Sequence, residues 1–152
     1  MKLRHSIVLD GSLDEVWDLF VDPARWRQWN TEWAEIRDVR GPFDHPGAGY
    51  TQVLRVLGRD RLGEWRVVEC EPKLWRRVGG RLPLGIRFRG RDEFRPLAQG
   101  TEVSLEIELD MPLGPLGRAA GRLFLPILRR QLRANAARAK AVLEQPRRGA
   151  QR

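Results

Sequence analysis

The strongest constraint on the fold is an alternation of side chains that runs from Arg87 to Asp110. Apolar or small residues alternate there with arginines in the first half and with glutamates in the second half. If the chain turns at Ala98-Gln99, the inner pairs are Phe94 with Val103 and Phe88 with Leu109. The outer pairs are then Arg95 with Glu102, Arg91 with Glu106, Arg89 with Glu108 and Arg87 with Asp110. A slip of one residue would turn every charge toward the apolar face, so the register of this antiparallel hairpin is strongly specified.

One strand, two short helices and four shorter strands are expected before this hairpin. Residues 3–9 are rich in aliphatic side chains, which is typical of a strand. Ser12 and Glu15 form a capping box, so a helix should begin at Leu13 and end at the Asp22-Pro23 break. Pro23 can open a second short helix, which would place Trp26, Trp29, Asn30 and Trp33 on one face. Period-two segments at 34–40, 50–57, 61–71 and 74–81 then precede the hairpin strands at 84–95 and 101–111.

The last segment, residues 116–144, predicts one long amphipathic helix. Its apolar stripe and its basic face separate at helical spacing, and Pro126 should kink the helix or mark its effective start. The stripe consists of Phe124, Leu128, Leu132, Asn135, Ala139 and Leu143. An antiparallel sheet of this length must curl around one such helix to bury both apolar faces. If more than one layer of side chains separates them, a cavity is left between them.

Length and composition indicate a single domain. The chain has 152 residues and one cysteine, Cys70, which excludes an internal disulfide and fits a reducing cytoplasm. It contains no run of apolar residues long enough for a membrane span. We therefore expect a cytoplasmic protein with one domain at 1–144 and a disordered basic tail at 145–152. His5 and His45 lie far apart, and no Cys/His spacing suggests a metal or calls for a cofactor.

The formal net charge of +8 raises the question of an anionic partner. Most of the basic residues are arginines spread along the whole chain among glutamates and aspartates, which favours a solvated surface over a nucleic-acid site. The densest basic group is Arg129, Arg130 and Arg133 together with the tail. A peripheral contact with an anionic membrane stays open, and the sequence does not indicate an oligomeric state.

In the order and spacing of several segments, the chain resembles the START-like (SRPBCC) superfamily, in its polyketide cyclase/dehydrase and lipid-transport branch. The segments are HSIVLDGSLDEVWDLFVDPARWRQW, GEWRVVECEP, GTEVSLEIELDM and LRANAARAKAVLE. The resemblance covers nearly the whole chain. It implies an α+β helix-grip fold, in which a seven-stranded antiparallel sheet wraps around the C-terminal helix and encloses an apolar ligand cavity. This agrees with the element order derived above.

The resemblance also implies a range of functions, from carriers of lipids and quinones to aromatase/cyclases that fold polyketide chains. Those cyclases use a cavity arginine and nearby hydroxyl groups on the strand that matches GEWRVVECEP. Here Glu69 stands at the arginine position and Val67 at a hydroxyl position, while Trp33 replaces a tyrosine. These departures argue against transferring the cyclase activity directly.

Two carboxylates are candidates for chemistry. If Trp65 and Val67 face inward, period two places Glu69 in the cavity as well, where Arg76 on the neighbouring strand could pair with it. Alternatively, a bulge between Cys70 and Pro72 would turn Glu69 out to solvent. Asp92 lies on the inner face of the final hairpin, either as a cavity group or bonded to the backbone at the mouth.

The four tryptophans at 17–33 are expected to form the lid and end wall of the pocket, either as core packing or as a platform for ligand rings. Asn135 and Gln131 on the long helix could bond a ligand or a sheet edge. No single residue is identified as catalytic. The predicted ligand-binding residues are Trp29, Trp33, Trp65, Val67, Glu69, Arg76, Phe88, Asp92, Phe94, Leu128 and Asn135.

Three functions follow from this sequence. The first is a carrier or sequestering module for a small hydrophobic or aromatic ligand such as a lipid, polyketide or quinone-like molecule. The second is a polyketide aromatase/cyclase-type enzyme with Glu69 or Asp92 as general base. The third is an adaptor whose basic helix face binds anionic lipid or RNA.

Overall fold

The computed structural model describes residues 1–145 and shows a seven-stranded antiparallel sheet, as predicted. Its spatial order is β1-β7-β6-β5-β4-β3-β2, so every strand except β1 lies next to its neighbour in sequence. The strands are β1 (Lys2–Leu9), β2 (Ile36–Arg40), β3 (Gly49–Val56), β4 (Arg59–Glu71), β5 (Trp75–Arg81), β6 (Arg87–Leu97) and β7 (Gly100–Asp110).

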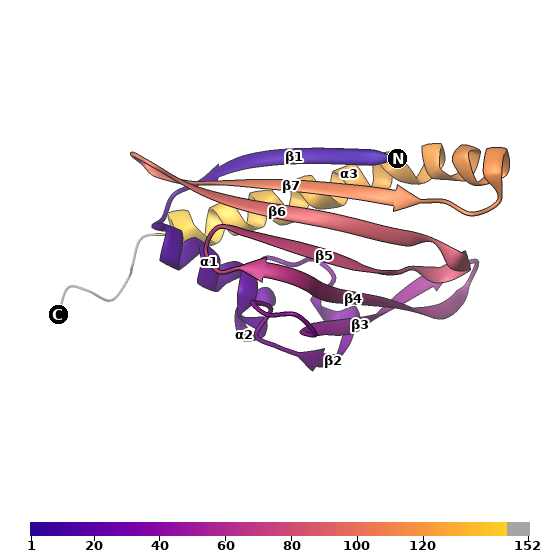
Figure 1. Ribbon diagram of the computed structural model, residues 1–152, viewed down its shortest axis with the longest axis horizontal. Helices are drawn as coiled ribbons and strands as arrows, with labels where there is room; N and C mark the ends of the chain where they lie inside the picture. Colours follow the sequence, from indigo (N-terminus) through magenta and orange to yellow (C-terminus); the bar gives the residue numbers. More distant parts are fainter. Residues whose placement is uncertain (146–152) are drawn as a thin grey trace.

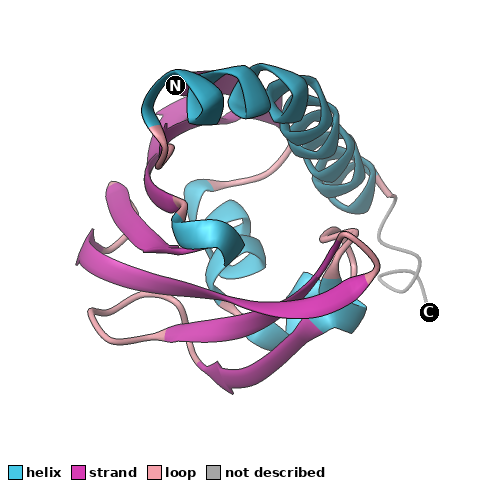
Figure 2. Cartoon of the chain, turned by 90° about the vertical axis from the view of Figure 1, so that its right-hand side faces the viewer, coloured by secondary structure: helices cyan, strands magenta, loops and turns pink. Residues whose placement is uncertain are grey.

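The helices cover the concave side of this sheet. They are α1 (Leu13–Val21), α2 (Pro23–Trp26) and the long α3 (Gly114–Glu144), with single 3₁₀ turns η1 (Trp33–Glu35) and η2 (Pro83–Gly85). Figure 1 shows α3 running behind the strands along the length of the molecule. The view along that axis shows the sheet curling around the space in which α1, α2 and α3 lie (Figure 2). The predicted helix-grip architecture is therefore confirmed.

The predicted register of the last hairpin is also confirmed. Phe94 lies opposite Val103 and Phe88 opposite Leu109, and the turn falls at residues 98–99. The charged outer face forms the ion pairs Arg95–Glu102 at 3.1 Å and Arg89–Glu108 at 3.5 Å. Arg91 faces Glu106 in the register, but its side chain donates instead to Glu93. This face is a solvated ladder of charges.

The front of the chain follows its capping signals, with one exception. The Ser12 hydroxyl accepts a hydrogen bond from the backbone N–H of Glu15, and α1 ends at Val21 before the Asp22-Pro23 break. Pro23 opens α2, but this helix lasts only until Trp26. The prediction that Trp26, Trp29, Asn30 and Trp33 share one helical face is therefore wrong. Turns carry the chain from residue 27 onward, and Trp33 begins a separate 3₁₀ turn.

The helix α3 continues through Pro126 without ending. No helix within residues 1–145 is long and apolar enough to cross a membrane. The predicted disordered tail, apart from Gln145, lies outside the described residues.

Candidate functional site

A cavity of about 240 Å³ lies between the concave face of the sheet and α3. Most of its walls are apolar, as in small-molecule sites generally. They come from strands across the sheet, from α1, α2 and the turn after it, and from residues 124–136 in the middle of α3. The ring of Phe88 forms part of this wall and lies over Gly80, where a Cβ would stand 2.6 Å from the ring. The predicted hollow interior is therefore present.

One wall of the cavity carries a buried ion pair. Arg76 on β5 and Asp92 on β6 are direct partners in the sheet register. The Asp92 Oδ2 atom accepts hydrogen bonds from Arg76 Nε at 2.9 Å and from Nη2 at 2.6 Å. The third donor, Arg76 Nη1, binds the backbone carbonyl of Phe43 at 3.0 Å. The Arg76 side chain is only 3% exposed, so both charges have lost most of their contact with water. These hydrogen bonds offset the cost of that desolvation.

Two aromatic rings continue this polar row across the sheet. The Arg76 guanidinium lies over the ring of Trp65, 5.2 Å from its centroid. Trp65 stacks on Tyr50 of β3 with their centroids 5.0 Å apart and an interplanar angle of 18°. The wall therefore runs from Asp92 through Arg76 and Trp65 to Tyr50, and all four residues line the cavity.

The Tyr50 hydroxyl is the free polar group of this row. Within residues 1–145 no hydrogen bond joins it to another group, and no fully buried polar side-chain atom lacks a partner. The hydroxyl must therefore reach the cavity space. Burial raises the pKa of Tyr50, and the nearby Glu32 carboxylate raises it further. The hydroxyl thus stays protonated at neutral pH and is available to donate to a guest molecule.

Glu69 does not lie in the cavity, so its predicted inward orientation is wrong. A bulge between Val67 and Glu69 shifts the register of β4 by one residue. Glu69 therefore points outward, where Oε1 lies 2.6 Å from Arg77 Nη2 in an exposed ion pair. The alternative of an outward Glu69 holds, although the bulge lies earlier than expected. Arg76 finds its partner in Asp92 instead.

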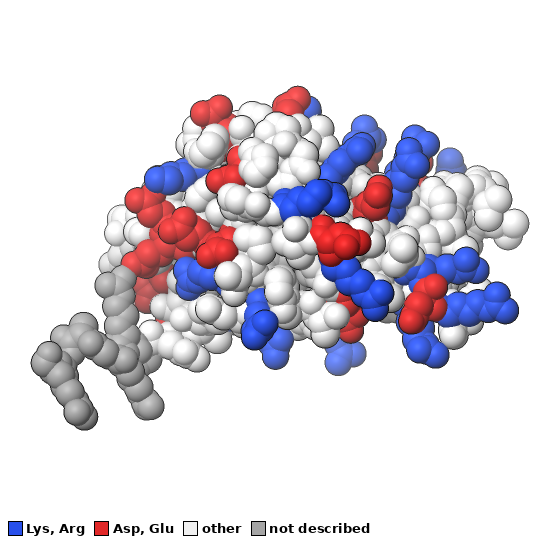
Figure 3. All heavy atoms as spheres, turned by 90° about the horizontal axis from the view of Figure 1, so that it is seen from below, with Lys and Arg blue, Asp and Glu red and all other residues white. Residues whose placement is uncertain are grey.

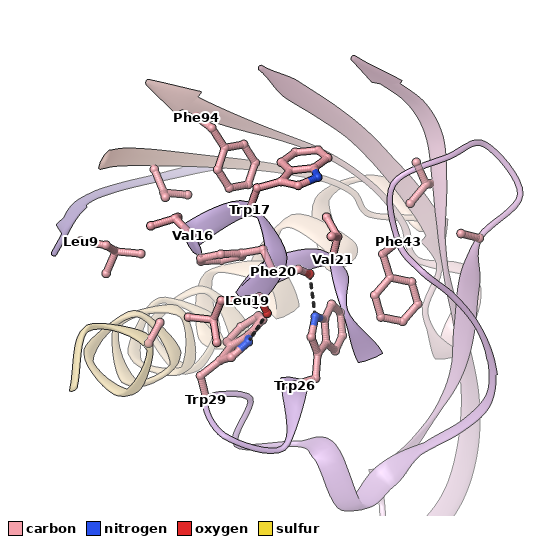
Figure 4. Close-up of a cluster of buried hydrophobic side chains, with 14 of the residues drawn as sticks. Leu9, Val16, Trp17, Leu19, Phe20, Val21, Trp26, Trp29, Phe43 and Phe94 are labelled. Carbon is pink, nitrogen blue, oxygen red and sulfur yellow. Dashed lines mark hydrogen bonds between the residues drawn. The ribbon is translucent and has the colours of Figure 1, made fainter. Parts of the chain in front are cut away.

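The early tryptophans divide between core and cavity wall. The indole N–H groups of Trp26 and Trp29 donate to the carbonyls of Phe20 and Leu19, as Figure 4 shows. Both rings also line the cavity. Trp17 packs edge-on against Phe94 at 4.9 Å and does not line it. Trp33, half-buried against the core, does not line it either.

The remaining predicted residues are placed as follows. Leu128 and Asn135 of α3 line the cavity together with Trp29, Trp65, Arg76, Phe88 and Asp92. Val67 and Phe94 belong to the solid core and do not line it. The Asn135 carbonyl oxygen accepts from the Thr31 N–H and hydroxyl, at 3.0 and 2.9 Å, so this residue ties α3 to the loop after α2. Gln131 lines the cavity beside it.

Metal binding and thiol chemistry were the other kinds of site to consider among the described residues. No group of three or more His, Cys, Asp or Glu side chains within residues 1–145 could hold a metal ion. Burial raises the pKa of the Cys70 thiol, which keeps it in its unreactive protonated form at neutral pH.

Sequence reasoning missed Tyr50, Asn30 and the Glu32–Gln52 pair, which all line the cavity. The side-chain amide of Gln52 donates to Glu32 Oε2 at 2.5 Å. The side-chain oxygen Oδ1 of Asn30 accepts from the Glu32 backbone N–H at 2.9 Å. A signal for Tyr50 and Gln52 was available, because period two on the 50–57 strand places both on one face. Asn30 and Glu32 lie in a turn, where no periodicity indicates orientation.

The sheet, the gripped helix and the hollow between them define the class of helix-grip ligand-binding proteins. Residues 1–144 match the family described as "Polyketide cyclase / dehydrase and lipid transport". The chain belongs to this family, whose members generally bind small hydrophobic ligands. No curated protein matches the sequence.

Solved structures show the same fold at low sequence identity. Protein CV1439 from Chromobacterium violaceum superposes with a TM-score of 0.67 and 17% identity, covering 95% of this chain and 99% of its own. One half of the di-domain ARO/CYC StfQ from the steffimycin biosynthetic pathway matches with a TM-score of 0.72 and 15% identity. This match covers 94% of this chain and 50% of StfQ. DynU16, a putative protein in the dynemicin biosynthetic locus, matches with a TM-score of 0.69 and 18% identity, covering 95% of this chain and 47% of its own.

Proposed function

We propose that the protein binds a small hydrophobic or aromatic molecule with one polar group, and that it carries or sequesters this molecule. The observation that carries the proposal is the apolar cavity with the Tyr50 hydroxyl open at one wall. Apolar burial would supply the affinity, at roughly 25 cal/mol per Å² of surface removed from water. The Tyr50 hydroxyl would set the orientation by bonding a carbonyl, hydroxyl or phenol of the guest.

The size of the cavity narrows the ligand class. Its volume of about 240 Å³ lies below the ~300–1,000 Å³ typical of pockets for drug-sized ligands. This favours a guest with one or two rings or a short chain over an extended polyketide. A charged guest is disfavoured, because the Arg76 guanidinium is already neutralised by Asp92.

Filling the cavity should abolish binding without unfolding the protein. Ile107 on β7 lines the cavity, and Ile107→Trp would place an indole ring in the space for the guest. Val8→Trp is the matched control, since Val8 is an exposed residue outside the cavity. Mass spectrometry of a denatured extract from the native host should find one small molecule with wild type and Val8→Trp and none with Ile107→Trp. Recovery of the same molecule from a folded Ile107→Trp protein would contradict the proposal, as would an empty wild type.

An aromatase/cyclase-type enzyme is the second candidate, favoured by a carboxylate and a free phenol on one cavity wall. Asp92 Oδ2 is occupied by Arg76, while Oδ1 has no hydrogen bond within residues 1–145. Oδ1 would act as general base on an acidic C–H of a poly-β-ketone, and the Tyr50 hydroxyl would stabilise the enolate oxygen. The structural similarity to StfQ supports this candidate.

If the protein is such an enzyme, Tyr50→Phe should lower the turnover of a synthetic poly-β-ketone mimic about a hundredfold. Glu69→Gln should leave turnover unchanged, because Glu69 lies outside the cavity in an exposed ion pair. Product formation can be followed by liquid chromatography. Absence of turnover by the wild-type protein would remove this candidate and leave the carrier.

A further inference from the structure

An exposed apolar stripe runs along the first half of α3. Leu116, Leu123 and Ile127 recur at intervals of seven and four residues, which places them on one side of the helix. They are 75%, 79% and 60% exposed. Burial of side chains of this size stabilises a protein, so several of them left together in water indicate an interaction surface.

This stripe continues into the cavity. Phe124, next to Leu123 on α3, is 53% exposed and lines the cavity at the same time. Close to the start of α3, η2 carries the exposed Leu84, and a Cβ on Gly85 would lie 3.7 Å from Pro112. We call Leu84, Leu116, Leu123, Phe124 and Ile127 the mouth surface. The end of the molecule that carries it faces the viewer in Figure 2.

The helix that bears the mouth surface is strongly basic. From residue 114 to 143 it has six arginines and one lysine and no acidic residue. Among the described residues its only ion pair joins Lys140 to Glu144 at the far end. Several arginines of the sheet, in contrast, pair with carboxylates, as in Arg77–Glu69 and Arg95–Glu102. On the face drawn in Figure 3, acidic side chains gather on the left and most basic side chains lie at the centre and on the right.

We propose that the mouth surface docks on an anionic lipid membrane, so that a guest passes between bilayer and cavity without crossing water. This inference rests on the proposed ligand binding. The exposed apolar side of α3 also carries Arg130, three residues after Ile127 and without an ion pair within residues 1–145. Apolar side chains with basic ones beside them match the two chemistries of a lipid interface, an apolar interior and anionic headgroups. A second copy of the chain fits poorly, because it would bring two basic helices together. RNA would leave the leucines without a partner.

The test is co-sedimentation of the full chain with vesicles of phosphatidylcholine alone or with one third phosphatidylglycerol. We expect at least tenfold stronger binding to the anionic vesicles, weakened by salt. Leu123→Ser with Ile127→Ser should lower this binding about tenfold. Arg122→Gln with Arg130→Gln should do the same, since each arginine near the surface contributes on the order of a threefold to fivefold gain. All four side chains are exposed, so the variants should fold.

Matched controls separate the mouth surface from general charge and hydrophobicity. Val8→Ser with Leu74→Ser removes two exposed apolar residues elsewhere, and Arg27→Gln with Arg66→Gln removes the same charge elsewhere. Both controls should bind vesicles like wild type. Equal binding to neutral and anionic vesicles, or equal loss in controls and mouth variants, would overturn the proposal. A dimer that Leu123→Ser with Ile127→Ser dissociates would overturn it too. If a ligand is extracted from the protein but the protein does not bind vesicles, the proposed ligand binding stands and only the membrane docking is overturned.

Discussion

Replacing Arg76 by methionine should lower the free energy of unfolding by about 3–5 kcal/mol, because it leaves the Asp92 carboxylate buried without its counter-charge. The guanidinium supplies both hydrogen bonds to Asp92 Oδ2 and one to the Phe43 carbonyl. The loss would appear in urea denaturation as a lower midpoint.

Arg77→Met is the matched control, since Arg77 neighbours Arg76 and pairs with the exposed Glu69. Its loss should stay within about 1 kcal/mol. Arg76→Met combined with Asp92→Leu should recover most of the stability, because no lone charge is left in the cavity wall. If Arg76→Met costs no more than Arg77→Met, the buried ion pair does not stabilise the fold as we infer.

Trp26→Ala should lower the free energy of unfolding by a similar amount, about 3–5 kcal/mol. Trp26 lies at the centre of the aromatic cluster, with ring centroids 4.5 Å from Phe43, 5.2 Å from Tyr50 and 5.3 Å from Trp29. Its indole N–H also donates to the Phe20 carbonyl at 2.7 Å. Alanine would remove these contacts and open a space beside the cavity.

Trp75→Ala provides the comparison, because Trp75 is only half-buried and is covered by Arg91 at 4.8 Å. Its loss should be clearly smaller than that of Trp26→Ala when both are measured by urea denaturation. If both variants lose the same free energy of unfolding, the contacts of Trp26 stabilise the protein no more than those of a partly exposed ring.

The last hairpin could be predicted down to single residue pairs because its alternation is uninterrupted over both strands. Any other register would place charges such as Arg91 or Glu108 against the core. The start of α1 was predictable for a similar reason, since the Ser12 cap acts within one helical turn.

The orientation of Glu69 could not be predicted in the same way. Period two holds only while each residue has one partner on the next strand, and the bulge between Val67 and Glu69 adds an unpaired residue. The bulge brings Cys70 inward and leaves the Glu69 charge in water, which avoids the cost of burying a carboxylate. The position of such a bulge depends on the curvature of the whole sheet, so the sequence of one strand does not determine it.

The sequence by itself therefore determined the order of the elements, the hairpin register and the inward position of Asp92, because these follow from contacts between near neighbours. Only the tertiary structure decided that Arg76 meets Asp92, that Tyr50 and Trp65 complete the polar wall, and that a cavity stays open. Those features depend on how separate strands pair and on the distance between the sheet and α3. The curl of the sheet and the position of α3 set these distances, and no local pattern encodes them.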